Sequence, residues 1–327
     1  MLITRKHASV FNKKRGSPKT GVLKRNAKLI RKNPVLLFMM LPGIIYLIIN
    51  NYLPMFGIFI AFKDINFAKG IWGSEWVGWS NFTYLFSSQD VLRITRNTIL
   101  YNGAFIILGT TASITVAILL NEIKTRILAR FYQSVILLPY LISMVVIAYL
   151  VLAFLNEENG FINQSLLPLL GQDPVSWYTS PEYWPYILTF VHLWKIIGYS
   201  CIVYLAAILA IPHDLYESAT LDGASKWKQI WSITLPMITP TIIVLFLLDV
   251  GRIFYSDFGL FYQVPLNSGA LQPTTDVIDT YVYRGLMTFG DLGMSSAAGL
   301  YQSVVGFILV VTMNGMVRRR NKDLALF

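Results

Sequence analysis

Six apolar segments of membrane length dominate this chain, and they constrain its fold more than any other feature. A bilayer core requires about 20 apolar residues for each spanning helix. The segments that meet this length lie near 35–62, 97–120, 131–155, 186–211, 236–256 and 296–317. We therefore expect an all-α integral membrane protein with six transmembrane helices. Prolines within the first and fifth segments predict bends rather than breaks in those helices.

The composition supports a membrane protein and argues against a nucleic-acid partner. The 327 residues are 55% hydrophobic and 13% charged, with a mean hydropathy of +0.55. The net charge is +10, but eleven basic residues and no acid fall within the first 33 positions, and Arg318 to Arg320 add more at the other end. Basic ends beside apolar spans are typical of cytoplasmic termini. The single cysteine, Cys201, excludes an internal disulfide, and we expect it to be a small core residue.

Loop charges predict the orientation of the spans. The loop 121–130 carries three basic residues and one acid, whereas the loop 156–185 carries four acids and no base. The stretch 257–295 has four acids and only Arg284. The positive-inside rule then places both termini and the stretch after the fourth span inside. We expect a basic cytoplasmic tail over 1–34, a membrane region over 35–317 and a short cytoplasmic tail over 318–327.

The polar stretch 217-ESATLDGASKWKQIWSITLP-236 lies on the predicted cytoplasmic side, between two strongly apolar segments. Trp227, Ile230 and Trp231 follow the i, i+3, i+4 spacing of one helical face. Gly223 interrupts the pattern, so we expect a helix, a bend and a second helix. Two interpretations fit this shape: a helix that rests on the membrane surface, or an element that docks on another protein.

Eight residues of this stretch match a known pattern. They resemble the EAA loop of type I ABC importer permeases, and they are Glu217, Ala219, Asp222, Gly223, Ala224, Ile233, Leu235 and Pro236. In that family the loop, here about 213–236, is a cytoplasmic coupling helix that inserts into a groove of the ATPase subunit. Ser218 and Ile230 depart from the usual alanine and phenylalanine. The resemblance implies these ATPase-coupling residues: Glu217, Ser218, Ala219, Asp222, Gly223, Ala224, Trp227, Leu235 and Pro236.

The resemblance extends over nearly the whole chain. The segments 42–66, 97–102, 119–122, 138–146 and 276–286 look like those of LplB/YteP-like carbohydrate permeases, with departures at Tyr140, Leu141 and Met144. It implies an oligosaccharide cargo, from a complex polysaccharide or glycan, and a multi-pass location in the bacterial cytoplasmic membrane. It also implies a second homologous permease, two copies of an ABC ATPase and an extracellular substrate-binding lipoprotein as partners.

The sequence shows no signature of catalysis or of nucleotide binding. It contains no G-x-x-x-x-G-K-[ST] loop to cradle phosphates and no H-E-x-x-H metal motif, and its three histidines are scattered. We therefore expect a permease that is not an enzyme and that binds no cofactor or metal. ATP and magnesium would belong to the partner ATPase.

Ionisable residues inside the predicted spans are candidates for a cargo path, because such groups are costly in a bilayer and usually mark a pathway or a pair. His192 and Lys195 lie in the fourth span near aromatic side chains that suit a sugar. Asp249 and Arg252 lie one helical turn apart in the fifth, where a structural ion pair is the preferred interpretation and a cargo path or a subunit interface are the alternatives. The candidates for the path are Trp194, Lys195, Tyr199, Asp249, Arg252 and Tyr255.

Two other functions remain open at this level. An ion-coupled secondary carrier would need a coupling carboxylate and usually an internal inverted repeat, and no clear repeat is visible. A membrane-embedded glycan enzyme would need a motif with catalytic spacing, which is absent. A neighbouring gene for a second six-span chain with its own EAA-like loop would favour the importer.

Overall fold

The computed structural model describes residues 34–320, so most of the two predicted basic tails lies outside the described residues. The chain forms two compact units, one ending at Ile58 and one beginning at Phe59. The described part of the first unit is helical and consists of α2 (Pro34–Leu47), a π-helical turn (Ile48–Tyr52) and α3 (Leu53–Met55). The turn ends two residues before Pro54, which has no backbone N–H to continue a regular α-helix.

The six predicted spans are present. Among the described residues, five helices are long and apolar enough to cross a membrane: Phe38–Phe62, Gln89–Asn121, Pro181–Leu209, Lys226–Val250 and Leu292–Arg319. A pair of helices joined by a sharp bend accounts for the sixth. The prediction of an all-α, six-span protein is therefore confirmed, although the fifth span begins and ends earlier than its hydropathy suggested.

The third predicted span is two helices rather than one. Helix α7 (Arg126–Leu141) and helix α8 (Met144–Leu155) meet at 94°. The break exposes backbone groups that a continuous helix would satisfy. Ser143 caps the start of α8 by accepting from the Val146 N–H, and the Lys195 ammonium donates to the carbonyls of Tyr140 and Ile142 at the end of α7. Hydropathy does not reveal such a bend, because the apolar run continues from the end of α7 across the break into α8.

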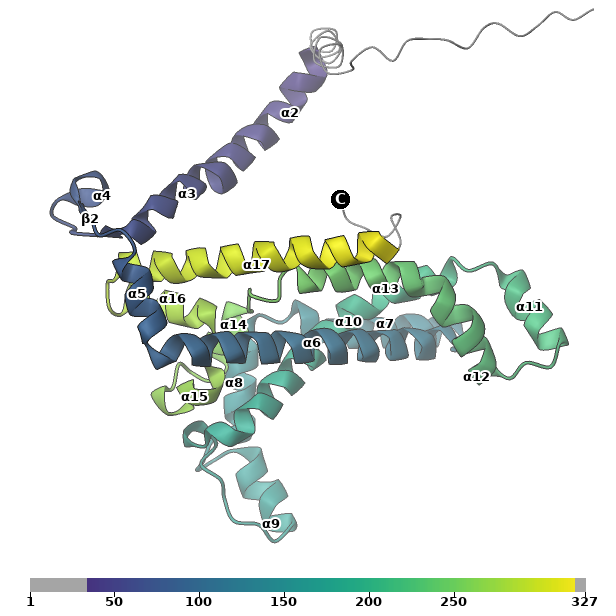
Figure 1. The fold of residues 1–327 in the computed structure, drawn as a ribbon. Helices are drawn as coiled ribbons and strands as arrows, with labels where there is room; N and C mark the ends of the chain where they lie inside the picture. Colours follow the sequence, from purple (N-terminus) through teal and green to yellow (C-terminus); the bar gives the residue numbers. More distant parts are fainter. Residues whose placement is uncertain (1–33, 321–327) are drawn as a thin grey trace, which may run out of the picture. The chain divides into compact units, whose positions relative to one another are not determined.

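Four long helices form the body of the second unit (Figure 1): α6 (Gln89–Asn121), α10 (Trp184–Leu209), α13 (Leu235–Val250) and α17 (Leu292–Arg320). Helix α10 packs along α6 and also contacts α7 and α13. A Cβ at Gly198 of α10 would lie 2.0 Å from the Ile136 carbonyl oxygen, so only glycine allows α7 to approach this closely.

Two apolar clusters divide the bundle along its length. One includes Tyr101 and Phe105 of α6 and Val191 of α10, together with residues of α8 and α14. The other includes Ala117 of α6 and Cys201 of α10 and extends toward the end that carries the coupling loop. Cys201 is 1% exposed, which confirms its prediction as a core residue. Between the two clusters, α6 and α10 carry polar side chains.

Short elements gather at the end of the bundle opposite α11 (His213–Leu221) and α12 (Lys226–Gln229), as Figure 1 shows for α5, α15 and α16. A two-stranded antiparallel ribbon pairs Lys63 with Trp76. The elements there are β1 (Lys63–Asp64), α4 (Gly70–Gly73), β2 (Glu75–Trp76), α5 (Ser80–Ser87), α14 (Phe258–Gln263), α15 (Gln272–Thr275) and α16 (Ile278–Met287). Between α8 and α10 lies α9 (Leu167–Leu169), flanked by a π-helical turn (Ile162–Leu166) and short 3₁₀ turns.

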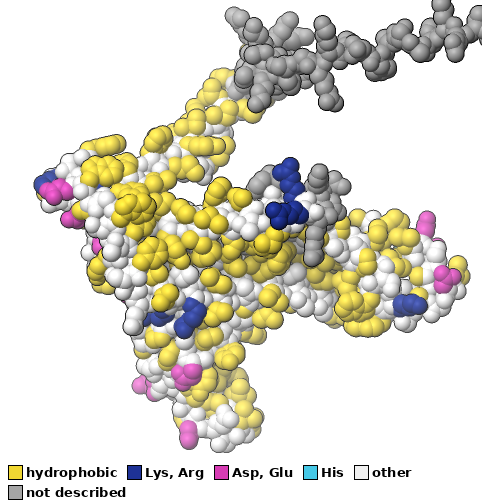
Figure 2. All heavy atoms as spheres, in the orientation of Figure 1, with side chains coloured by type: hydrophobic (Ala, Val, Ile, Leu, Met, Phe, Trp, Pro, Cys, Tyr) yellow, Lys and Arg dark blue, Asp and Glu magenta, His cyan; other side chains and the backbone are white. Residues whose placement is uncertain are grey.

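The surface has the character expected of a lipid-facing protein. Figure 2 shows apolar side chains over the length of the bundle, with the few charged side chains in view lying mostly toward its ends. Leu92, Ile107, Phe190 and Phe307 are each at least 65% exposed. In water such a surface would aggregate, whereas hydrocarbon solvates it.

Candidate functional site

The first candidate site is the stretch 213–236 that resembles an EAA loop, here named the coupling loop, and its backbone follows the predicted helix, bend and helix. Helix α11 ends at Leu221, and α12 begins at Lys226. Gly223 between them has φ +77°, a left-handed conformation that glycine adopts without strain. The Ala224 N–H returns to the Ala219 carbonyl at 2.8 Å, which closes the turn.

Three side-chain hydrogen bonds hold the coupling loop together. Gln229, only 4% exposed, donates its amide to the Thr220 hydroxyl at 3.0 Å and to the Ala224 carbonyl at 3.2 Å. The Tyr216 and Thr234 hydroxyls share a hydrogen bond of 2.9 Å. Helix α11 is therefore fixed to the helix that follows it, and the loop forms one stiff unit.

The outer surface of the loop remains open. Glu217, Ser218 and Asp222 are exposed, and Leu221 is 90% exposed. Trp227 and Trp231 are 69% and 60% exposed, and their rings meet edge to face at 6.2 Å. Small, acidic and aromatic side chains thus lie together on one solvent-facing element.

The second half of the loop is continuous with the fifth span. Helix α12, a π-helical turn (Ile230–Thr234) and α13 form a single helix from Lys226 to Val250. Leu235 and Pro236 begin α13, and Pro236 removes one N–H from the helical ladder directly after the π-helical turn. At about 1.5 Å per residue this helix is ~37 Å long along its path, so one continuous helix connects the coupling loop with the interior of the bundle.

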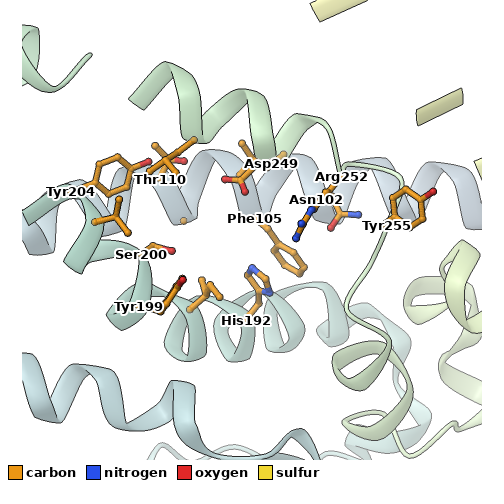
Figure 3. Close-up of a pocket in the computed structure, with 15 residues that line it drawn as sticks. Asn102, Phe105, Thr110, His192, Tyr199, Ser200, Tyr204, Asp249, Arg252 and Tyr255 are labelled. Carbon is orange, nitrogen blue, oxygen red and sulfur yellow. The ribbon is translucent and has the colours of Figure 1, made fainter. Parts of the chain in front are cut away.

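The second candidate site is a cavity of about 300 Å³ between α6, α10 and α13. It lies at the level that separates the two apolar clusters. Figure 3 shows Asp249 and Arg252 on the α13 side of this space and His192, Tyr199 and Ser200 on α10. Its polar lining comes from Asn102, Thr110, His192, Ser200, Asp249 and Arg252.

Aromatic rings supply the apolar faces of this cavity. His192 stacks on Phe105 with ring centroids 3.8 Å apart, and Tyr199 stacks on Tyr140 at 4.6 Å. Tyr255 shares a hydrogen bond of 3.2 Å with the Ser303 hydroxyl. Aromatic faces beside hydrogen-bonding groups are the chemistry that a sugar ring requires, because a sugar has both apolar C–H faces and hydroxyl edges.

Asp249 and Arg252 both line the cavity but do not form an ion pair with each other. No salt bridge or side-chain hydrogen bond joins either of them to another described residue, and their one mutual hydrogen bond is from the Arg252 backbone N–H to the Asp249 carbonyl. A buried structural pair would hold the two charged groups in contact. Here both charges are presented to the cavity instead.

The structure separates the six sequence-based candidates for the cargo path. Tyr199, Asp249, Arg252 and Tyr255 line the cavity together. Trp194 is absent from the lining, and Lys195 caps the break between α7 and α8. Position along a span therefore does not reveal which side of a helix a residue occupies.

Several lining residues were not among those candidates. Asn102, Thr110, Ser200 and Tyr204 line the cavity from α6 and α10. Asn102 was detectable in principle as an amide inside a predicted span, since such groups are rarely left facing lipid. The hydroxyls carry little signal, because Ser and Thr inside a helix often bond to their own preceding turn.

Residues 109–322 match the model of one protein family, described as the binding-protein-dependent transport system inner membrane component. The chain is also 33% identical to Protein LplB of Bacillus subtilis, over 90% of this chain and 92% of that protein. It is likewise 33% identical to the polygalacturonan/rhamnogalacturonan transport system permease protein YteP of the same organism, over 90% of this chain and 91% of that one.

Two solved structures resemble the fold. A chain of a bacterial ABC transporter involved in the import of the acidic polysaccharide alginate is 35% identical, with a TM-score of 0.83 over 91% of this chain and 99% of that chain. A second structure, of a bacterial alginate ABC transporter in complex with an alginate pentasaccharide-bound periplasmic protein, gives a TM-score of 0.82 at 35% identity, over 90% of this chain and 98% of that chain.

These findings identify the class and then the family. The chain is the multi-pass permease component of an ABC transport system, and it is not an enzyme. It belongs to the family of binding-protein-dependent transport system inner membrane components.

Proposed function

We propose that this permease imports oligosaccharides, specifically fragments of an acidic polysaccharide. Two relatives support this cargo. By their descriptions, one belongs to a polygalacturonan/rhamnogalacturonan transport system and the other is involved in the import of the acidic polysaccharide alginate. The cavity contributes aromatic faces, hydrogen-bonding groups and the Arg252 guanidinium, which has no side-chain partner among the described residues. A guanidinium binds a carboxylate through two parallel hydrogen bonds, and so suits a uronate unit.

The proposed assembly contains this chain, a second homologous permease, two ABC ATPases and an extracellular lipid-anchored binding protein. Both termini and the coupling loop would face the cytoplasm, and α5, α15 and α16 would face the binding protein. ATP and magnesium would be bound by the ATPase subunits alone. Glu217, Ser218 and Leu221 form the accessible surface that would enter the ATPase groove.

The proposed mechanism transmits ATPase closure through a single helix. ATP binds the closed ATPase dimer more tightly than the open one and so shifts the population toward closure. Closure displaces the coupling loop, which is fixed to the helix Lys226–Val250 by Gln229 and Tyr216. The far end of that helix carries Asp249, and the cavity therefore changes its access when the loop moves.

One observation carries this proposal: the second half of the coupling loop and part of the cavity wall belong to the same continuous helix. The test is uptake of labelled oligogalacturonides into vesicles that hold the complete complex with ATP inside. ATP-dependent uptake that requires the loaded binding protein is expected. Complexes that hydrolyse ATP in response to the binding protein but transport no acidic oligosaccharide would refute the cargo.

Thiol labelling tests the proposed orientation in a chain without Cys201. A cysteine at Asp173 is expected to react with an impermeant reagent from outside, and one at Lys124 only after the inner face is opened. Both positions are exposed, whereas a Cβ at Gly160 in the same outer loop would lie 2.2 Å from the Asn156 carbonyl oxygen. The reverse labelling would invert the proposed sidedness.

A further inference from the structure

The chain between α13 and α14 has no regular helix, yet it presents two side chains to the cavity. This irregular segment, residues 251–257, carries Arg252 and Tyr255. Irregular backbone near membrane depth is tolerated only where other protein groups satisfy its N–H and C=O groups or where it lines a cavity. The groups that hydrogen-bond this backbone therefore help to determine the shape of the cavity wall.

Three side chains from three different helices bind the backbone of this segment. Asn102 of α6 donates to the Ile253 carbonyl at 2.8 Å. Gln302 of α17 donates to the Phe254 carbonyl at 2.6 Å, and Asp279 of α16 accepts from the Ser256 N–H at 2.7 Å. We call Asn102, Asp279 and Gln302 the outer clasp.

Two members of the outer clasp are also linked to each other, and the third makes a second bond to the irregular segment. The Gln302 amide lies 3.2 Å from both carboxylate oxygens of Asp279, and the Asn102 amide lies 3.2 Å from the Ser256 hydroxyl. Gln302 is 5% exposed. Burial raises the pKa of the Asp279 carboxyl, and the hydrogen bonds from Ser256 and Gln302 oppose that rise. A connected polar network of this kind holds its members in one arrangement.

Two of these residues act on the cavity only indirectly. Asn102 lines the cavity itself, but Asp279 and Gln302 do not. Phe254, whose carbonyl Gln302 binds, is 3% exposed and faces the core, while its neighbours Arg252 and Tyr255 face the cavity. Asp279 and Gln302 therefore reach the cavity wall through the backbone of residues 253–256, whereas Ser303 beside Gln302 binds the Tyr255 side chain directly.

We propose that Asp279 and Gln302 are positioning residues for cargo recognition, which fix the irregular segment so that Arg252 and Tyr255 face the cavity. This role rests on the proposed function, because it assumes that cargo passes through this cavity. The two residues hold the cavity wall in the shape that binds cargo and make no contact with the cargo.

The first test needs no cargo. Tyr255→Cys is placed in a Cys201→Ser chain, and the rate of thiol labelling is measured in assembled complexes. Gln302→Leu or Asp279→Ala is expected to change that rate roughly fivefold or more, since each leaves a backbone group without its partner. Asp279→Asn keeps an acceptor oxygen for the Ser256 N–H and is expected to restore most of the original rate. Gln133→Leu on α7 is the matched control. An unchanged rate in assembled Gln302→Leu complexes would overturn the proposal.

The second test separates positioning from folding. Uptake of labelled oligogalacturonides is measured against the concentration of loaded binding protein, in complexes of equal thermal stability and with Tyr255 intact. Gln302→Leu is expected to raise the concentration for half-maximal uptake about tenfold while the maximal rate stays within about twofold. A fall in maximal rate alone would contradict positioning. If the unaltered complex takes up none of these sugars, the proposed cargo fails, and the labelling test still decides the role of the clasp.

Discussion

The two ends of the helix Lys226–Val250 are held in place in different ways. At the coupling loop, the bonds from Gln229 to Thr220 and between Tyr216 and Thr234 join residues 9 and 18 positions apart. Beyond the cavity end, Asn102 and Gln302 reach backbone groups 151 and 48 positions away. The coupling end is a local module, whereas the cavity end depends on the packed bundle.

This difference predicts how the two ends fail. A change in the coupling loop should leave the bundle and its cavity intact and break communication with the ATPase. A change at the cavity end should leave that communication intact and alter the handling of cargo. Transport and ATP hydrolysis can be measured separately, so the two kinds of failure are distinguishable.

The largest effect is expected for Gly223→Pro. Proline fixes φ near −65°, while the turn requires +77° at this position. We expect assembled complexes whose ATP hydrolysis no longer responds to loaded binding protein. Gly171→Pro is the matched control, because Gly171 also has a positive φ of +67° but lies between α9 and α10. Normal cargo-stimulated hydrolysis by Gly223→Pro would show that this loop does not couple.

The second effect is a loss of uptake in the double variant Asp249→Leu with Arg252→Leu. Both side chains line the cavity without contacting each other, so their joint removal takes both charges from the proposed cargo site. We expect assembly and stimulated ATP hydrolysis with strongly reduced uptake. The control removes an exposed ion pair, Lys69 and Glu75 at 3.1 Å. Its loss should lower the free energy of unfolding by less than ~1 kcal/mol and leave uptake unchanged. Near-normal uptake by the first variant would exclude the pair from the path.

A partial effect is expected for Gln229→Leu. The change removes two hydrogen bonds that fix α11 to the following helix, each worth ~1 kcal/mol. We expect cargo-stimulated ATP hydrolysis to fall roughly fivefold, with uptake falling in proportion, since coupling is loosened rather than lost. Gln133→Leu again serves as the control. A change in cargo preference with normal cargo-stimulated ATP hydrolysis would show that Gln229 acts on the cavity and not on coupling.

The smallest effect concerns alkaline pH at the end of the bundle opposite the coupling loop. Burial raises the pKa of Tyr178 from 10.0 to about 12, and its hydroxyl faces the Val264 carbonyl. Because the pKa of Tyr178 is higher in the folded state than in the unfolded state, folding favours the protonated hydroxyl. The stability that this gives is present below pH 10 and is lost as the pH rises through about 12. Tyr178→Phe should flatten the fall in melting temperature of the complex over this window. An unchanged fall would assign the alkaline instability to other groups.

The sequence predicted the local end of this helix far better than the distant end. The bend at Gly223 and the face of Trp227 and Trp231 follow from neighbouring residues, and short-range rules describe both. The prediction that Asp249 and Arg252 are structural partners also used short-range reasoning, since residues three apart on a helix are neighbours. The helix ends at Val250, before Arg252, and so the assumed geometry does not apply.

The bend between α7 and α8 could not be predicted from the sequence for a related reason. Its stabilising groups are Ser143 nearby and Lys195, which comes from a helix about fifty residues later. Lys195 is an unusual residue inside a predicted span, but a charged residue at membrane depth fits either a ligand contact or a helix cap. Only the packed bundle distinguishes between them.

The π-helical turn Ile230–Thr234 sets the angular phase between the two ends of the helix. Each residue in an α-helix turns the direction of its side chain by ~100°, and a π-helical turn holds one residue more than an α-helical path of the same length. The turn therefore absorbs one residue, and deleting one residue here would restore an α-helical path and leave the two ends nearly in their present phase. Deleting one residue from the regular part of α13 would instead leave both ends and their sequences in place but rotate the tryptophan face of the coupling loop by ~100° relative to Asp249. Torque applied by an ATPase would then reach the cavity along the wrong axis, and neither end would show a defect in isolation.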